Sequence, residues 1–237
     1  MMRPWRSWDH VLKIDPDKDL VDGDTFEDVC QTGTDALMIG GTTGITEQKM
    51  ADVLEACAAY DIPLYLEPNA PEVAIRDERL SGYLIPTVFN TANPFFLVGA
   101  HMDWIRMSDE LPWEEITTQA YIVLNPDSAA ATYTEANTDL TPEQVAAYAT
   151  AADRLFGQDI VYLEYSGTFG DVDTVRAAKD AVDDGTIFYG GGIHDFKSAQ
   201  TMGEVSDVVI VGDLVHDEGV DAVRETVAGA KQATQTH

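Results

Sequence analysis

Three apolar stretches of the 237-residue chain end in glycine-rich junctions, and such junctions can bind an anion. The first, at residues 162–170, also carries the Glu164 carboxylate and the Ser166 hydroxyl, and the others are residues 189–193 and 211–213. Glycine lets backbone N–H groups approach a phosphate, and the N-terminus of a following helix adds a favourable dipole. Together the junctions predict a phosphate site beside the Glu164 carboxylate. Tyr162 lies two residues earlier on the same strand, so its side chain shares the face of Glu164.

A second polar group follows the earlier apolar runs. Lys13 and Asp15 are two residues apart in a strand-like segment, so both side chains leave the same face. Thr42 follows the next run, after two glycines. Mg²⁺ is usually held by one or two carboxylates, water and substrate phosphates. The carboxylate of Asp15 and the hydroxyl of Thr42 suit such a site. The two anion sites predict a reaction between a phosphorylated acceptor and a diphosphate donor.

The elements that must position these side chains alternate along the chain. Short, nearly all-apolar segments are predicted strands, because a sheet buried on both faces needs such runs. The pattern predicts an α/β fold, a single (β/α)8 TIM-type barrel over residues 1–237 with residues 1–8 as an arm across its bottom. The predicted strands are residues 10–15, 35–39, 62–67, 83–89, 120–124, 160–163, 187–189 and 208–211. The predicted helices are residues 25–31, 46–60, 94–107, 171–182, 195–202 and 218–231, and one that Thr141 begins.

Two segments depart from this pattern. Residues 68–82 contain two prolines and a broken apolar pattern, so we expect an irregular third crossover. Residues 125–139 are predicted to form a long polar loop on the face of the glycine junctions. Long loops in compact domains are often functional, and we interpret this one as a lid.

Composition limits the partners and the compartment. The chain has 42 acidic and 14 basic residues, a net charge of −28. Such a surface repels nucleic acid and anionic headgroups, so we expect no nucleic acid and at most transient membrane contact. An ordinary core under an acidic surface is typical of a halophilic archaeal protein. Cys30 and Cys57 lack metal-ligand spacing and fit a core in a reducing cytosol, and no signal or membrane-spanning run is evident, so we expect a cytoplasmic protein.

Seven motifs in chain order make the sequence similar to the geranylgeranylglyceryl phosphate synthase family of archaeal prenyltransferases. Each is weak alone, but together they extend in register from the first strand to the last. They are Lys13-Ile14-Asp15-Pro16-Asp17-Lys18, Ile39-Gly40-Gly41-Thr42, Tyr83-Leu84-Ile85-Pro86, Leu124-Asn125-Pro126-Asp127-Ser128, Tyr162-Leu163-Glu164-Tyr165-Ser166-Gly167, Tyr189-Gly190-Gly191-Gly192-Ile193 and Val211-Gly212-Asp213.

The resemblance implies a barrel that lacks one crossover helix, and it implies a reaction. The 3-hydroxyl of sn-glycerol 1-phosphate would attack carbon one of geranylgeranyl diphosphate, releasing diphosphate and forming the first ether bond of archaeal membrane lipids. It assigns Mg²⁺ to Asp15 and Thr42, and the role of base or orienter of the hydroxyl to Glu164. The residues implied for glycerol phosphate are Lys13, Tyr162, Leu163, Glu164, Tyr165, Ser166, Gly167, Gly192, Gly212 and Asp213.

Asp213 departs from the family, which usually has asparagine there. A carboxylate about 4 Å from a phosphate would cost on the order of 4 kcal/mol at an effective dielectric constant near 20. We therefore expect the backbone N–H of Asp213 to meet the phosphate while its carboxylate turns to solvent or a cation. His194 is either a phosphate-binding aid or an exposed residue at a helix start. Residues 83–89 and 94–104 are expected to wall a prenyl groove.

Several alternatives remain open at this point. An open doubly wound sheet would need a Gly-x-Gly-x-x-Gly turn, which residues 40–44 do not provide. Sugar-phosphate isomerases use paired acids at strands one and five, whereas the fifth strand here ends at Asn125, and a Schiff-base aldolase needs a lysine at a strand end. A phosphometabolite-binding barrel and a longer prenyl donor are further alternatives. We expect a homo-oligomer, a dimer, and we interpret His101, His216 and His237 as surface or satisfied core residues.

Salt should control the stability of this chain. Because 42 acidic residues repel one another without screening in dilute buffer, we expect marked loss of structure there. Thermal unfolding across a KCl series measures this, with sucrose as a non-ionic control for solvent exclusion. The melting temperature should rise with KCl, and one that does not depend on salt would contradict the prediction.

Overall fold

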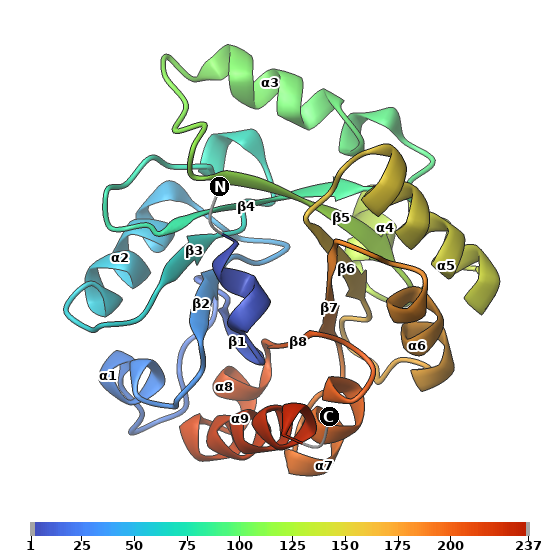
Figure 1. Cartoon of the computed structure of the whole chain (residues 1–237). Helices are drawn as coiled ribbons and strands as arrows, with labels where there is room; N and C mark the ends of the chain where they lie inside the picture. Colours follow the sequence, from blue (N-terminus) through green and yellow to red (C-terminus); the bar gives the residue numbers. More distant parts are fainter. Residues whose placement is uncertain (1–2, 236–237) are drawn as a thin grey trace.

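The computed structural model describes residues 3–235, and its eight parallel strands close into a barrel (Figure 1). The strands are β1 (His10–Ile14), β2 (Ala36–Ile39), β3 (Leu64–Leu66), β4 (Gly82–Val88), β5 (Ile116–Val123), β6 (Ile160–Glu164), β7 (Thr186–Gly190) and β8 (Val208–Val211). Each strand pairs with the next, and β1 pairs with β8 to close the sheet. The predicted (β/α)8 fold is confirmed. The predictions for Met1, Met2 and His237 concern positions outside the described residues.

Helices surround the barrel (Figure 1). The α-helices are α1 (Phe26–Cys30), α2 (Glu47–Cys57), α3 (Gly99–Met107), α4 (Ala129–Thr134), α5 (Pro142–Thr150), α6 (Val172–Asp180), α7 (Phe196–Gly203), α8 (Leu214–Asp217) and α9 (Val220–Thr234). Short helical turns are η1 (Pro4–Ser7), η2 (Pro71–Val73), η3 (Pro94–Phe96) and η4 (Ala151–Leu155). Local signals set several starts: the Thr141 side chain caps α5 in a capping box, with Pro142 in the first turn. Within residues 3–235 no helix is long and apolar enough to cross a bilayer.

The connection from β3 to β4 holds only the short turn η2, so the described chain has no α-helix at this crossover. The predicted irregular third crossover is confirmed. Without a covering helix, this side of the barrel leaves a groove that is lined by the crossover, β4 and α3.

One local prediction was wrong. Residues 125–139 are not a structureless loop, because Ser128 caps the N-terminus of α4 and Glu135 ends that helix in a left-handed conformation, φ 53°. The predicted helix over residues 218–231 corresponds to α9. Gly219, with φ 86°, separates α9 from the short helix α8, which precedes the predicted range.

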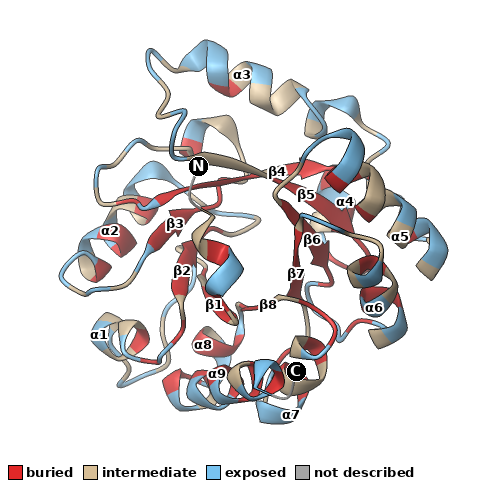
Figure 2. Ribbon diagram, in the orientation of Figure 1, coloured by how far each residue is buried: buried red, intermediate tan, exposed pale blue. Residues whose placement is uncertain are grey.

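The strands are buried, as their red colour in Figure 2 shows, and their side chains form two layers, one inside the barrel and one between the barrel and the helices. Alternate strand residues such as Leu12 and Leu37 point outward and pack under the helices, whereas Tyr65 and Phe188 point into the barrel. Trp8 closes the bottom of this interior, with its ring 5.1 Å from that of Tyr65 and 6.4 Å from that of Phe188. The N-terminal arm therefore plugs the end opposite to the glycine junctions.

His10 makes stability depend on pH in a defined direction. Its side chain is fully buried between the hydroxyls of Thr34 and Thr226, at 2.9 and 3.1 Å, and burial lowers its pKa from 6.5 to about 3. Between pH 6.5 and 3 the unfolded chain binds a proton at His10 and the folded chain does not. The free energy of unfolding therefore falls as pH falls through this range, by about 1.4 kcal/mol per pH unit.

In His10→Gln the free energy of unfolding should fall less steeply with acid than in wild type. Denaturant titrations at several pH values in constant KCl measure the two slopes. Protonation of surface carboxylates is common to both proteins, so the difference between the slopes belongs to His10. Equal slopes would refute this account.

Candidate functional site

Glu164 ends β6 and points into the top of the barrel. It is 3% exposed, and its Oε1 accepts a hydrogen bond from the backbone N–H of Ser166 at 2.7 Å. Burial raises the pKa of this carboxyl above its usual range, and the Lys13 ammonium and the Ser166 hydrogen bonds offset this only in part. A buried carboxylate with a raised pKa is a stronger base than an exposed one, which suits proton transfer.

The three predicted glycine junctions meet in one polar cavity next to Glu164. Gly167, Gly191 and Gly192 have φ values of +84°, +146° and +60°, which side chains rarely tolerate. At Gly192 a Cβ atom would lie 2.3 Å from the backbone nitrogen of Phe169, so glycine allows the two loops to approach. The predicted site residues that line this cavity are Lys13, Asp15, Thr42, Tyr162, Ser166, Gly167, Gly192, Gly212 and Asp213.

Two predicted site residues point elsewhere. The side chains of Leu163 and Tyr165 lie in the layer between the barrel and the helices, with the ring of Tyr165 5.9 Å from that of Tyr189. Only their main chain belongs to the glycine junction. His194 is exposed at the cavity edge, where its Nδ1 lies 3.0 Å from the carbonyl of Gly192.

The Asp213 carboxylate turns to a cation, as predicted, whereas the contact of its backbone N–H with a phosphate stays a prediction. Its Oδ1 accepts a hydrogen bond from Lys18 Nζ at 2.6 Å, and both side chains are largely exposed. His216 is also satisfied, because its Nε2 lies 3.2 Å from the backbone nitrogen of Asp15 and its Nδ1 lies 2.9 Å from the carbonyl of Asp19.

Asp15 and Thr42 come from neighbouring strand ends and share the polar cavity. The Asp15 carboxylate accepts a hydrogen bond from the backbone N–H of Asp17 at 3.0 Å. It lies so close to Gly41 that a Cβ there would be 2.5 Å from Asp15 Oδ1. In the part of the chain that the structure describes, no three His, Cys, Asp or Glu side chains are placed to share a metal ion. A cation here would therefore take most of its ligands from elsewhere.

Sequence reasoning missed Glu67, which follows β3 and is 4% exposed. It forms an ion pair with Lys13, and its Oε1 accepts hydrogen bonds from the Tyr121 hydroxyl and from Gln119 Nε2, the latter at 2.6 Å. Although burial disfavours a charged ammonium, the Glu67 and Glu164 carboxylates outweigh it and raise the pKa of Lys13. The available signal was a carboxylate at the end of an apolar run, the same signal that identified Glu164.

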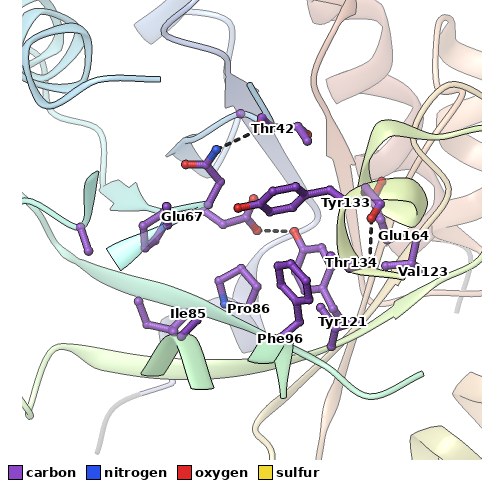
Figure 3. A pocket seen from close by; sticks show the side chains of 18 of the residues that line it. Thr42, Glu67, Ile85, Pro86, Phe96, Tyr121, Val123, Tyr133, Thr134 and Glu164 are labelled. Atoms are coloured by element: carbon purple, nitrogen blue, oxygen red, sulfur yellow. Dashed lines mark hydrogen bonds between the residues drawn. The ribbon is translucent and has the colours of Figure 1, made fainter. Parts of the chain in front are cut away.

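An apolar groove leads from this charged centre over β4 towards η3 and α3 (Figure 3). Its lining includes Ile85, Pro86, Val88, Phe96 and Trp104, so the two segments expected to wall a groove do so. Tyr133 and Thr134 of α4 border it from the other side, which places the helix that replaced the predicted loop at the site. His101 also lines the groove, with its Nε2 3.0 Å from the carbonyl of Pro86.

The groove and the polar cavity are continuous. Lys13, Gly41, Thr42 and Ser166 line both of them. The arrangement can therefore hold a polar, phosphate-bearing molecule and a long apolar one with their reactive ends beside Glu164.

Comparison with known proteins gives the family. Residues 3–230 match the PcrB family. The chain belongs to the PcrB family. Geranylgeranylglyceryl phosphate synthase of Haloquadratum walsbyi is 60% identical over 233 residues, which cover 98% of each chain. The protein of that name from Natronomonas pharaonis is 59% identical, covering 98% of this chain and 99% of its own.

A solved structure shares the fold of this PcrB family protein. The crystal structure of (S)-3-O-geranylgeranylglyceryl phosphate synthase from Thermoplasma acidophilum, in complex with its substrate sn-glycerol-1-phosphate, matches with a TM-score of 0.79. The match covers 96% of this chain and 93% of that one, at 21% sequence identity. At that identity the similarity shows a shared fold and nothing more.

Two glycines of this PcrB family protein offer a matched pair of substitutions. Gly192→Ala should destabilise the protein, because a left-handed alanine costs roughly 1–2 kcal/mol and its Cβ would meet the backbone of Phe169. Gly212→Ala should fold normally, since the nearest atom to its Cβ is Lys13 Cβ at 3.8 Å, yet it narrows the cavity.

Thermal unfolding and calorimetric titration with inorganic phosphate separate the two effects. We expect a lower melting temperature in Gly192→Ala alone and weaker phosphate binding in both. Unchanged phosphate binding in Gly212→Ala would show that the anion lies elsewhere.

Proposed function

We propose that this PcrB family protein is a geranylgeranylglyceryl phosphate synthase, a prenyltransferase that joins geranylgeranyl diphosphate to the 3-hydroxyl of sn-glycerol 1-phosphate. The observation that carries the proposal is the meeting of a glycine-lined polar cavity and an apolar groove at the buried carboxylate of Glu164. The two relatives that bear this name, and cover almost the whole chain, support it.

The polar cavity would hold sn-glycerol 1-phosphate. Backbone N–H groups around Gly167, Gly192 and Gly212 are available to a phosphate, and Lys13 supplies a positive charge at the cavity floor. Charge-assisted hydrogen bonds contribute about 1.5 to 3 kcal/mol each, so a few suffice without an arginine. The solved Thermoplasma acidophilum protein was crystallised with this molecule, which supports the choice of acceptor.

Glu164 would accept the proton of the acceptor hydroxyl. As the new bond forms between the glycerol oxygen and carbon one of the donor, the bond from that carbon to the diphosphate oxygen breaks with its electron pair. The hydroxyl proton passes to Glu164, whose buried position excludes competing water. Burial and the Glu164 charge raise the pKa of the neighbouring Tyr162, so this phenol stays neutral.

The apolar groove would hold the prenyl chain of the donor. Aliphatic and aromatic walls from β4, η3 and α3 bury hydrocarbon at roughly 25 cal/mol per Å² of apolar surface. The crossover from β3 to β4 has no α-helix, and this leaves room for these walls. The absence of that helix therefore serves the binding of the prenyl chain. A longer prenyl donor remains the alternative, and chain length is a matter for the assay.

Mg²⁺ is part of the proposal as the cation of the diphosphate. Asp15 and Thr42 fit it, because one carboxylate and one hydroxyl on the cavity wall leave the remaining positions to water and substrate oxygens. When bound, Mg²⁺ supplies neutralisation of the charge that develops on the leaving diphosphate.

We also propose that the enzyme works in a salt-rich cytoplasm, which its charge of −28 supports. The homo-oligomer stays a prediction.

The proposal is tested by a direct assay in molar KCl with Mg²⁺, in which the prenyl ether is followed by mass spectrometry. Wild type should form it, and Glu164→Gln should lose roughly 10²- to 10⁴-fold in kcat, the usual contribution of a general base. Because a base must be ionised, activity should rise with pH, through a pKa above the ordinary 4.5 of a glutamate.

Asp15→Asn tests the metal site separately. Its activity should fall and require more Mg²⁺, and a chelator should abolish wild-type turnover. Asp207→Asn, which breaks the Lys179–Asp207 ion pair near the barrel bottom, is the matched control and should keep full activity. A folded wild type that binds glycerol phosphate but forms no ether with any prenyl donor would overturn the function.

A further inference from the structure

Glu67 has no part in the reaction set out above, yet it lies where the groove meets the polar cavity (Figure 3). Its buried carboxylate is contacted by donors from two other strands: Lys13 of β1 and Gln119 and Tyr121 of β5. The question is what this network does for Glu164, the other carboxylate of the barrel centre.

Lys13 faces both carboxylates but is paired with only one. The charges of Glu67 and Glu164 both act on its ammonium, and the ion pair forms with Glu67. Within residues 3–235 Glu164 has no ion-pair partner, and its Oε1 is oriented by the N–H of Ser166. An ammonium has three N–H donors, so one bond to Glu67 leaves two for an anionic substrate in the cavity.

We propose that Glu67 is a positioning residue that holds the Lys13 ammonium on the β3 side of the barrel centre and so leaves the Glu164 carboxylate unpaired. The inference rests on the proposed function, because it concerns the proton acceptor of that reaction. If the ammonium moved to Glu164, that carboxylate would gain a positive charge in direct contact and become a weaker base. The proposal gives the second carboxylate a role at a distance from the reacting atoms.

The network is poorly explained as a stabilising device. Gln119 donates from Nε2 to Glu67, and its buried Oε1 has no hydrogen-bond partner among the described residues. Buried ion pairs generally contribute less than well-packed apolar side chains of similar volume, and an unpaired buried acceptor costs further stability. A cluster that costs stability at the meeting point of two cavities points to function.

A pH test requires every charged or titratable group that faces Glu164. These are Lys13 of β1, Glu67 just after β3, Tyr121 of β5 and Tyr162 on its own strand, and Tyr189 of β7 acts on it electrostatically from the outer layer. Burial raises the pKa of all three tyrosines, so they stay neutral near neutral pH. Lys13 and Glu67 are then the neighbours whose charge tunes Glu164, in opposite directions.

Glu67→Gln keeps the size of the side chain and removes its charge. In the prenyl ether assay we expect kcat to fall by roughly tenfold. The acid limb of the kcat profile should move to lower pH, because the Glu67 charge is gone and Lys13 turns to Glu164. Calorimetric binding of sn-glycerol 1-phosphate should stay near the wild-type value, since Lys13 remains in the cavity. Glu67→Asp, which keeps the charge, should recover part of the loss.

Two further variants keep the test decisive. Lys13→Met should move the acid limb to higher pH, opposite to Glu67→Gln, and it serves alone if Glu67→Gln does not fold. Asp207→Asn breaks a matched ion pair far from the site and should lower the melting temperature without moving the limb.

An unmoved limb in Glu67→Gln or Lys13→Met, or an equal shift in Asp207→Asn, would overturn the role of Glu67 alone. Absence of ether formation by wild type would overturn the proposed function, and this inference with it.

Discussion

The site depends on the closure of an eight-stranded barrel, because closure gives every strand one inner and one outer face. The parallel register sets Tyr121 opposite Tyr162 and Val123 opposite Glu164, so neighbouring strands present their inner residues at the same height. Lys13 is an inner residue of β1 in the same way. A slip of one residue on any strand would exchange its inner and outer side chains. The charged centre and the apolar packing beneath it therefore rely on one register.

Closure also explains how charges persist in a buried place. Below the strand ends, Trp8, Tyr65 and Phe188 fill the barrel and exclude water, which would make an isolated charge there very costly. The charges are confined to the upper rim, where Lys13 compensates one carboxylate and backbone N–H groups orient the other. Lys13, Glu67 and Glu164 together carry one net negative charge, and the Asp15 carboxylate adds to it beside a cavity that the proposed function requires to receive anions.

The sequence was informative where physical signals are local. Apolar runs followed by glycine located the barrel and the polar cavity, and Thr141 with Pro142 marked the start of α5. It was less informative where tertiary contacts decide. β5 begins at Ile116 with a polar stretch that carries Gln119, and such residues read as surface until the opposite strand ends supply partners.

Glu67 illustrates the same limit. A carboxylate after an apolar run signals a strand end, but nothing local shows that Lys13, distant in the chain, will pair with it. The helix α4 was missed for a different reason, since Ser128 is an ordinary cap and the polar residues around it suggested a loop. Both errors lie at the site, where local preference and tertiary need differ most.

The proposed reaction requires a protein with a charge of −28 to receive two phosphorylated substrates, so the field of its surface must be kept from its site. Of the described residues that line either cavity, Lys13 is the only lysine or arginine, so the cavities themselves provide little compensation. In molar salt the Debye length is about 3 Å, so surface carboxylates cease to act on an approaching anion beyond their immediate contact. Backbone N–H groups at the glycine junctions are dipoles in direct contact with the ligand and are screened far less. In concentrated salt an acidic surface is thus compatible with an anion site made of backbone N–H groups at glycines. In dilute buffer the same site would bind its substrates less tightly.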